Sequence, residues 1–439
     1  MLLQAGQMGW KHLFHLRDYV RSSLWLIPFI AIPIELAATR ILHRLDSWLG
    51  WTFLDLGVSG AQGMLNAIIT ATLSFVVFTF GSLLVALQIA SGQMTPRIIA
   101  TILVRDNVVR YTTGLFIFTL LFAISALNRI QTTAFQLVEF IAACLGVLCF
   151  AAFLFLIDYA SRLLRPISII GRVGEAGLRV IRSVYPDPNL NGSETARSLK
   201  ALGPPGRVVQ HSGKSEIILA VHLKDLMSLA EQSHGIIELV PQLGDFVATS
   251  EPLFRLYDGA TSLDESELKL TLAFGPERTL AQDPTFAFRI VIDIALKALS
   301  PAINDPTTAV IAIDQLARLL RSVGNRNLHT DEVLAATGEL RVICRTPNWE
   351  NFVELALTEI RLCGVQNIQI ARRLRAMIEN LIETLSKHRH PALLEQLTLL
   401  DREVDRLFIY GEDRALALVG DTQGLGGASG AKHVHSQSV

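Results

Sequence analysis

The most prominent pattern in the chain is a set of long apolar stretches in its first third, none of which carries a run of charges at its centre. A bilayer core of about 30 Å is crossed by roughly 20 mostly apolar helical residues. Lipid offers the backbone no hydrogen-bond partner, so a spanning segment has to be helical. The pattern therefore predicts a transmembrane domain at residues 1–161, with helices at about 24–39, 64–90, 112–127 and 137–159.

Basic residues predict how this domain is oriented. Lys and Arg cluster before the first apolar stretch, after the second and after the fourth, whereas the other two connections carry fewer of them. Cytoplasmic flanks of membrane helices are enriched in Lys and Arg, so we expect both termini and the large C-terminal region to be cytoplasmic. Because Pro28, Pro33 and Glu35 interrupt the first stretch, we expect an uncleaved anchor rather than a signal peptide.

Beyond the last apolar stretch, the pattern changes to that of an α+β region. We expect a basic helical connector and linker at 162–200, a small β-rich module at 201–262, a helical domain at 263–414 and a disordered tail at 415–439. Within the helical domain, one helix is expected at 331–343. The predicted fold class is an α-helical integral membrane protein with four transmembrane helices, followed by this cytosolic α+β region.

The β-rich module has a resemblance of its own. The run Gly235–Leu253 resembles the small barrel-sandwich fold of lipoyl and biotinyl domains. The hairpin-tip lysine that such carriers modify is not apparent in this run. We therefore interpret the module as structural rather than as a carrier of a prosthetic group.

Composition agrees with a chain that lies partly in a membrane. Of 439 residues, 50% are hydrophobic and 18% are charged, whereas soluble domains carry about 25% charged residues. The net charge of -1 leaves no basic footprint for nucleic acid. The four cysteines show no spacing typical of a metal or redox site, which favours a reducing compartment.

The second apolar stretch carries a polar stripe along one helical face. Its members are Asn66, Thr70, Ser74, Gly81 and Gln88, and the first three repeat at a spacing of four residues. Such a stripe can line a water-filled path between subunits. Small and hydroxyl residues also allow membrane helices to pack closely, and the sequence leaves both interpretations open.

Two charged residues in or near the membrane also have two interpretations each. Arg97 follows the second helix, where it can anchor the chain at the interface or form a ring at a pore mouth. Glu35 is the one carboxylate well inside the first stretch, where it is either an ion site or a residue close to the far interface. We expect the interfacial position for Glu35.

In the cytosolic region, the densest polar cluster is the segment from Leu299 to Thr308. It contains the candidate ligand residues Ser300, Asn304, Asp305 and Thr307. The structural interpretation is a turn between two helices, with Asp305 as the N-cap of the second. A helix N-terminus with free amides can also hold an anion, so a ligand site is the alternative.

This cluster carries a resemblance to a known family. The string Ser300-Pro-Ala-Ile-Asn-Asp-Pro306, the Thr95-Pro-Arg97 exit of the second stretch and Gly244-Asp-Phe-Val247 resemble a bacterial family of predicted membrane proteins, which is known only as a domain of unknown function. The resemblance spans nearly the whole chain. It implies an inner-membrane location and no activity.

The sequence contains no signature of an enzyme active site, such as a phosphate-binding loop or a His-Glu-x-x-His zinc motif. We therefore expect no catalytic residues, no cofactor and no metal. The leading hypothesis is a homo-oligomer in the lipid bilayer that conducts ions or small solutes and has a cytosolic regulatory region. The alternative is a membrane-anchored sensor or scaffold that binds a cytosolic protein partner. A weaker option is an enzyme acting on lipid through the segment Ser300–Thr308.

Overall fold

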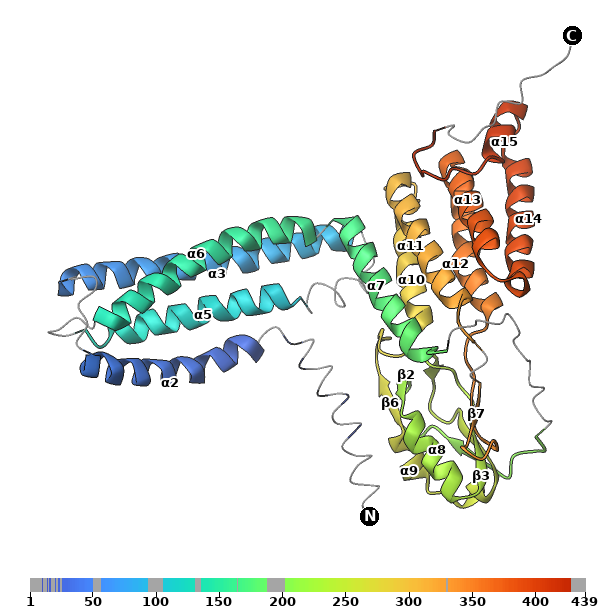
Figure 1. The fold of residues 1–439 in the computed structure, drawn as a ribbon, viewed down its shortest axis with the longest axis horizontal. Helices are drawn as coiled ribbons and strands as arrows, with labels where there is room; N and C mark the ends of the chain where they lie inside the picture. The colour runs from blue at the N-terminus through green and yellow to red at the C-terminus, as the bar shows by residue number, and fades with distance from the viewer. Residues whose placement is uncertain are drawn as a thin grey trace, which may run out of the picture. The chain divides into compact units, whose positions relative to one another are not determined.

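The computed structural model describes residues 26–49, 57–93, 106–130, 136–163, 165–187, 202–328 and 331–427, together with Trp10, Phe14, Leu16, Val20 and Ser23. The chain divides into two compact units (Figure 1). One unit comprises Leu16–Ile169, and the other comprises Met1–His15 with Ile170–Val439. We call them the membrane unit and the C-terminal unit.

Among its described residues, the membrane unit contains four helices that are long and apolar enough to cross a bilayer, which confirms the prediction of four such helices. They are α2 (Leu26–Leu49), α3 (Val58–Gln93), α5 (Asn107–Leu127) and α6 (Gln136–Leu163). All four extend beyond the predicted apolar stretches, because the polar residues that flank each stretch continue the helix. Helix boundaries in such flanks cannot be located from hydropathy alone.

Helix α5 is the inner helix of the membrane unit. Half of the most apolar segment of α5 is buried inside the unit, whereas the buried share of that segment is 18% or less in each of the other three helices. Its side chains Phe116, Phe122 and Ala123 are fully buried against α3 and α6. Gly114 allows α2 to approach, since an added Cβ would lie 2.7 Å from Cγ2 of Ile27. The outer helices keep broad apolar faces exposed, as expected of surfaces that face lipid.

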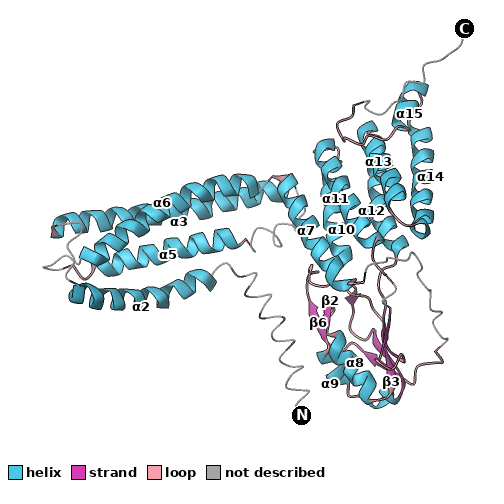
Figure 2. Cartoon of the chain, in the orientation of Figure 1, coloured by secondary structure: helices cyan, strands magenta, loops and turns pink. Residues whose placement is uncertain are grey.

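Most helices of the C-terminal unit form one layer of the chain's α+β region, whereas α8 (Leu223–Gln232) and α9 (Glu265–Leu270) lie with the strands (Figure 2). The helices of this layer are α7 (Pro166–Val184, from Ile170 onward), α10 (Pro284–Ala298), α11 (Pro306–Gly324), α12 (Trp349–Gly364), α13 (Ile368–Thr384), α14 (His390–Leu407) and α15 (Gly411–Ala417). Their core includes fully buried Phe288, Trp349 and Phe352. Helices α10 and α11 begin in the same way, because each has an Asp N-cap followed by Pro in the first turn.

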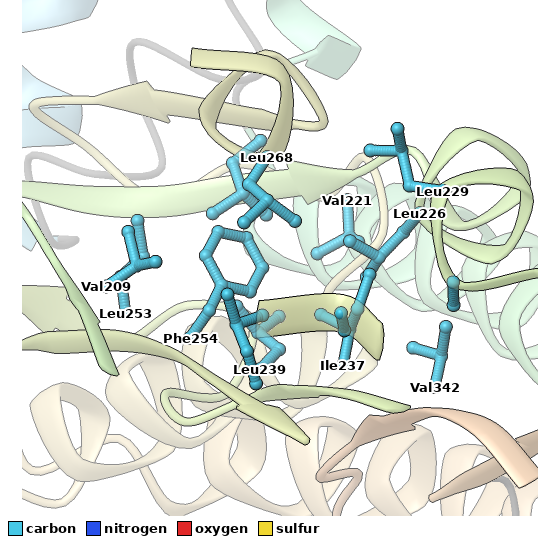
Figure 3. Packing of buried hydrophobic residues seen from close by; sticks show 14 of the residues in the cluster. Val209, Val221, Leu226, Leu229, Ile237, Leu239, Leu253, Phe254, Leu268 and Val342 are labelled. Carbon is cyan, nitrogen blue, oxygen red and sulfur yellow. The ribbon is translucent and has the colours of Figure 1, made fainter. Parts of the chain in front are cut away.

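The strands of this unit form two sheets that share one hydrophobic core. The strands are β1 (Arg207–Gln210), β2 (Glu216–Val221), β3 (Gly235–Leu239), β4 (Phe246–Val247), β5 (Pro252–Asp258), β6 (Leu272–Gly275), β7 (Glu332–Leu334) and β8 (Leu340–Cys344). The sheet orders are β1-β5-β3-β8-β7 and β4-β2-β6. Figure 3 shows Phe254 and Leu239 packed in this core with Leu268, which comes from helix α9 (Glu265–Leu270). Helix α8 (Leu223–Gln232) adds Leu226 and Leu229.

The expectation of a helix at 331–343 is wrong, because this segment forms strands β7 and β8. Gly338 adopts a φ of +83° in the turn between them, a conformation that favours glycine. Strand β8 pairs in parallel with β3, so that Val342 lies opposite Ile237. The β-rich part therefore includes residues far beyond 262, and its resemblance to a lipoyl-type barrel sandwich stays a prediction.

The expected disordered tail also differs from the structure over residues 415–427. Helix α15 ends at Ala417, and the chain then folds back as an ordered loop. Arg372, 2% exposed, donates hydrogen bonds to the backbone oxygens of Val419, Gly426 and Gly427 at 2.8–3.0 Å. The Asp421 carboxylate accepts three backbone N–H groups of the same loop. Residues 428–439 lie outside the described residues.

Two glycines on α7 provide a matched test of the helical packing. An added Cβ at Gly177 would lie 2.7 Å from Cβ of Ala287 and 2.9 Å from Cδ2 of Leu319, whereas one at Gly171 would meet no atom within 4 Å. We expect Gly177→Ala to lower the free energy of unfolding by about 1–3 kcal/mol through overpacking. Gly171→Ala should be neutral or stabilising by up to about 1 kcal/mol. Chemical denaturation of the purified protein measures both, and equal effects would contradict the close packing of α7.

Candidate functional site

The polar stripe of α3 lies on the outer surface of the membrane unit. Its five members, Asn66, Thr70, Ser74, Gly81 and Gln88, are all exposed. The face of α3 that packs inside the unit instead carries Ala61, Leu65, Thr72 and Thr79, each of which is buried. The structure therefore brings the predicted residues together on one face. Among the described residues, no other helix covers that face.

Hydroxyl groups on this face are satisfied by the helix itself. Thr70 Oγ1 donates to the backbone oxygen of Asn66 at 2.9 Å, and Ser74 Oγ donates to that of Thr70 at 2.8 Å. No hydrogen bond of the Asn66 amide occurs within the part of the chain that the structure describes. Gly81 is open, since an added Cβ would meet no atom within 4 Å. The stripe thus offers a neighbour the exposed amides of Asn66 and Gln88.

Arg97, the candidate for a pore mouth, lies outside the described residues. Its two interpretations, an interfacial anchor and a charged ring, therefore stay predictions.

Glu35 is a buried residue of α2, and its expected position near the far interface stays a prediction. It is nine residues beyond the start of α2 at Leu26, about 13 Å along the axis at 1.5 Å per residue. The side chain is only 2% exposed, and its Oε1 accepts a hydrogen bond from Thr39 Oγ1 at 2.6 Å. The predicted stretch at 24–39 could not show where Glu35 lies along its helix, because α2 continues well beyond residue 39.

Thr39 and Asp46 were not singled out by the sequence, although they continue the face of α2 that Glu35 begins. All three are buried, and their spacing of four and seven residues places them on one side of the helix. The Asp46 carboxylate accepts the backbone N–H of Leu137 at 3.0 Å, at the start of α6. This face of α2 is therefore a polar seam inside the membrane unit, and its spacing is the signal that could have revealed it.

In the C-terminal unit, the segment Leu299–Thr308 is a compact turn. The Asp305 carboxylate accepts the backbone N–H of Thr308 at 3.1 Å and also the Thr308 hydroxyl. Ser300 Oγ donates to the backbone oxygen of Lys297 at 2.7 Å. Asn304 adopts a φ of +47° and is exposed together with Thr307. Asp305 thus caps α11 as the structural interpretation predicts, while a ligand on Ser300, Asn304 or Thr307 stays a prediction.

Asp283, the N-cap of α10, is more deeply buried than Asp305. Its side chain is 4% exposed, and its Oδ1 accepts the backbone N–H of Phe286 at 3.1 Å. Burial raises the pKa of Asp283, although hydrogen bonds from Thr285 and the positive charge of Arg278 oppose the shift. The turn that precedes β4 approaches closely at Gly244, where an added Cβ would lie 2.5 Å from Oδ2 of Asp283. Asp283 therefore joins the β-rich and helical layers of the unit.

Within the described residues, no group of three or more His, Cys, Asp or Glu side chains is placed to hold a metal ion. The polar side chains of the α3 stripe are hydroxyls and amides. Their arrangement is suited to hydrogen bonding with water, lipid or another helix.

The hydrogen bond between Thr39 and Glu35 gives a stability prediction. Thr39→Val removes the donor while keeping the side-chain shape, and leaves a buried carboxylate oxygen without that hydrogen bond. We expect a loss of about 1–3 kcal/mol. Thr70→Val is the matched control on an exposed face, and we expect it to change stability by less than about 0.5 kcal/mol. Thermal unfolding in detergent measures both, and an unchanged Thr39→Val variant would show that the seam contributes little to stability.

The turn at Ser300–Thr308 gives a second prediction. Asp305→Ala removes the cap of α11 and should cost about 1 kcal/mol, whereas Asp305→Asn keeps a capping oxygen and should cost only a few tenths. Thr307→Ala, at an exposed hydroxyl, should be neutral. Denaturant titration measures all three variants, and a destabilised Thr307→Ala would contradict the structural interpretation of the turn.

Comparisons with known proteins agree with this architecture without assigning an activity. An uncharacterised protein of Mycobacterium tuberculosis strain H37Rv is 26% identical over 421 residues, which cover 91% of this chain and 80% of that protein. An uncharacterised protein of Mycobacterium bovis shows the same identity and coverage. No solved structure is significantly similar to this chain.

The family model described as "Predicted membrane protein (DUF2254)" matches residues 21–380. The match includes all four apolar helices, the β-rich layer and the helical layer as far as α13. On this match, the chain belongs to that family of predicted membrane proteins of unknown function.

Proposed function

We propose that the protein is a homo-oligomeric channel of the inner membrane, in which the polar stripe of α3 faces a shared axis and provides a path for ions or small solutes. The observation that carries this proposal is the exposure of the whole stripe on the single subunit. The C-terminal unit then acts as a cytosolic regulatory region. The proposal explains why this polar face of α3 is turned outward.

The energetic argument starts from the cost of an amide in lipid. An amide that loses its hydrogen bonds on transfer from water to an apolar environment costs roughly 2–7 kcal/mol. The exposed side chain of Asn66 lies on an apolar helix, so lipid is an unfavourable neighbour for it. Water in a pore, or the same face of another copy, satisfies this group. Oligomerisation through α3 is therefore favoured over an isolated subunit.

A contact within the C-terminal unit supports a common side for the two ends of the chain. The ring of Trp10 lies against that of His222, with 4.6 Å between ring centroids. His222 directly precedes α8 in the β-rich layer. The two rings can meet only on one side of the membrane, so an even number of membrane-spanning helices has to lie between Trp10 and His222. Because the flanks of the helices on this side are rich in Lys and Arg, we place both ends of the chain in the cytoplasm.

A second function is favoured by an apolar surface on the C-terminal unit. Ile409 and Tyr410 are 86% and 72% exposed in the connection between α14 and α15. Exposed apolar clusters can mark sites of protein association. The alternative function is thus a membrane-anchored sensor or scaffold whose cytosolic partner binds here.

Cysteine accessibility tests the pore. In a variant that lacks the four native cysteines, we expect Ser74→Cys to react with a charged, membrane-impermeant thiol reagent at least about tenfold faster than Val147→Cys, because only water supports the reactive thiolate. Val147 is the matched control, since it is 70% exposed on the outer surface of α6. In liposomes, the same modification of Ser74→Cys should reduce ion flux.

Equal protection of the two cysteines, together with no flux under any ion gradient or voltage, would contradict the channel. Recovery of a stoichiometric partner whose binding is lost in Tyr410→Ala would then favour the scaffold.

A further inference from the structure

A cavity of about 150 Å³ lies within the membrane unit between α3, α5 and α6. Its walls are mainly apolar, with Phe78 and Leu83 from α3, Val109 from α5, and Phe153 and Leu156 from α6. A cavity of this size with apolar walls stays dry in proteins and accepts hydrocarbon ligands. Its natural occupant is therefore apolar in the part that fills it.

One wall residue of the cavity carries an unused hydrogen-bond donor. Thr79 is 6% exposed, and its Oγ1 has no hydrogen-bond partner among the described residues. Other hydroxyl residues of the same helix behave differently: Thr70 and Thr72 donate to the backbone oxygen four residues earlier, at 2.9 and 2.6 Å. A buried polar group without a partner is costly. The other lining hydroxyls, those of Ser82 and Ser161, donate to their own helices. The occupant is thus expected to bring one acceptor oxygen, for Thr79.

The position of the cavity along α6 indicates which kind of molecule can occupy it. Helix α6 has 28 residues and is about 42 Å long at 1.5 Å per residue, so its ends reach the headgroup layers of a bilayer with a core of about 30 Å. The cavity is lined by Leu156 and also by Ala160, Ser161 and Leu163 in the last turn of α6. It therefore crosses the boundary between acyl chains and headgroups, where phospholipid ester carbonyls lie.

A basic residue follows the end of α6 that lines the cavity. Arg165 is exposed two residues beyond Leu163, at the end of α6 that leads into the C-terminal unit. Arg162 is already paired with Asp158. Arg165 thus adds a positive charge two residues beyond the cavity residue Leu163, which favours an anionic headgroup at this end of α6.

We propose that this cavity binds one acyl chain of an anionic phospholipid from the leaflet at the Arg165 end of α6. An ester carbonyl oxygen accepts the hydrogen bond of Thr79 Oγ1, and the headgroup phosphate lies at Arg165. On the α3 helix, Thr79 lies on the side opposite the polar stripe, because nine residues separate it from Thr70, about 180° at 100° per residue. Lipid and a neighbouring copy therefore do not compete for the same face.

The test uses the full-length protein in nanodiscs that contain phosphatidylglycerol with a photoactivatable acyl chain. In the wild-type protein, peptides that include the cavity residues of α3 or α6 should carry the label. Thr79→Val should weaken retention of phosphatidylglycerol about three- to tenfold in native mass spectrometry, the effect of one lost hydrogen bond. Thr72→Val is the matched control and should not change it, since its hydroxyl bonds its own helix. Ala160→Phe, which fills the cavity, should abolish labelling.

Two further measurements keep the result interpretable. Phosphatidylcholine of the same chain length should be retained less well than phosphatidylglycerol, and Arg165→Gln should remove that preference. Labelling of wild-type protein only at peptides outside the cavity, or equal labelling in a folded Ala160→Phe variant, would overturn the proposal. Because none of these measurements uses flux or Ser74, their failure leaves the channel proposal unaffected, and failure of the channel leaves the lipid site unaffected.

Discussion

A polar group inside a bilayer has to find a hydrogen-bond partner, and this constraint shapes the membrane unit. The polar groups of α2 find their partners within the subunit. Thr39 donates a hydrogen bond to Glu35, and Asp46 accepts one from the backbone N–H of Leu137 in the first turn of α6. On α3 the opposite arrangement occurs, since Asn66 and the rest of the stripe face outward. The polar groups of α2 are thus paired within the subunit and those of the α3 stripe are exposed, and this difference is the basis of the assembly that we propose.

The C-terminal unit depends on a different set of contacts, in which charged groups organise the backbone. Asp283 and Asp305 cap the two helices that begin with the same Asp-Pro-Thr pattern. Arg372 holds the glycine-rich loop after α15 through backbone oxygens. These interactions hold helix starts and loops in place within the unit.

The sequence predicted those features that depend on local pattern. Apolar length located the four membrane helices, and the Asp-Pro-Thr pattern located the starts of α10 and α11. Features that depend on distant partners were missed: β8 is a strand because it pairs with β3, which is about a hundred residues earlier. The burial of Glu35 and the order of residues 418–427 likewise depend on other helices. For the candidate site, the stripe was found by its spacing, while its exposure required the structure.

The central claim is that copies of the chain meet along the polar face of α3. Distances between single spin labels in a purified oligomer in nanodiscs, measured by pulsed electron paramagnetic resonance, test it most directly. A label at Ser74 should give a shorter distance between copies than a label at Val147, which is 70% exposed on α6. A monomer, or a Ser74 distance equal to or longer than that of Val147, would contradict the account.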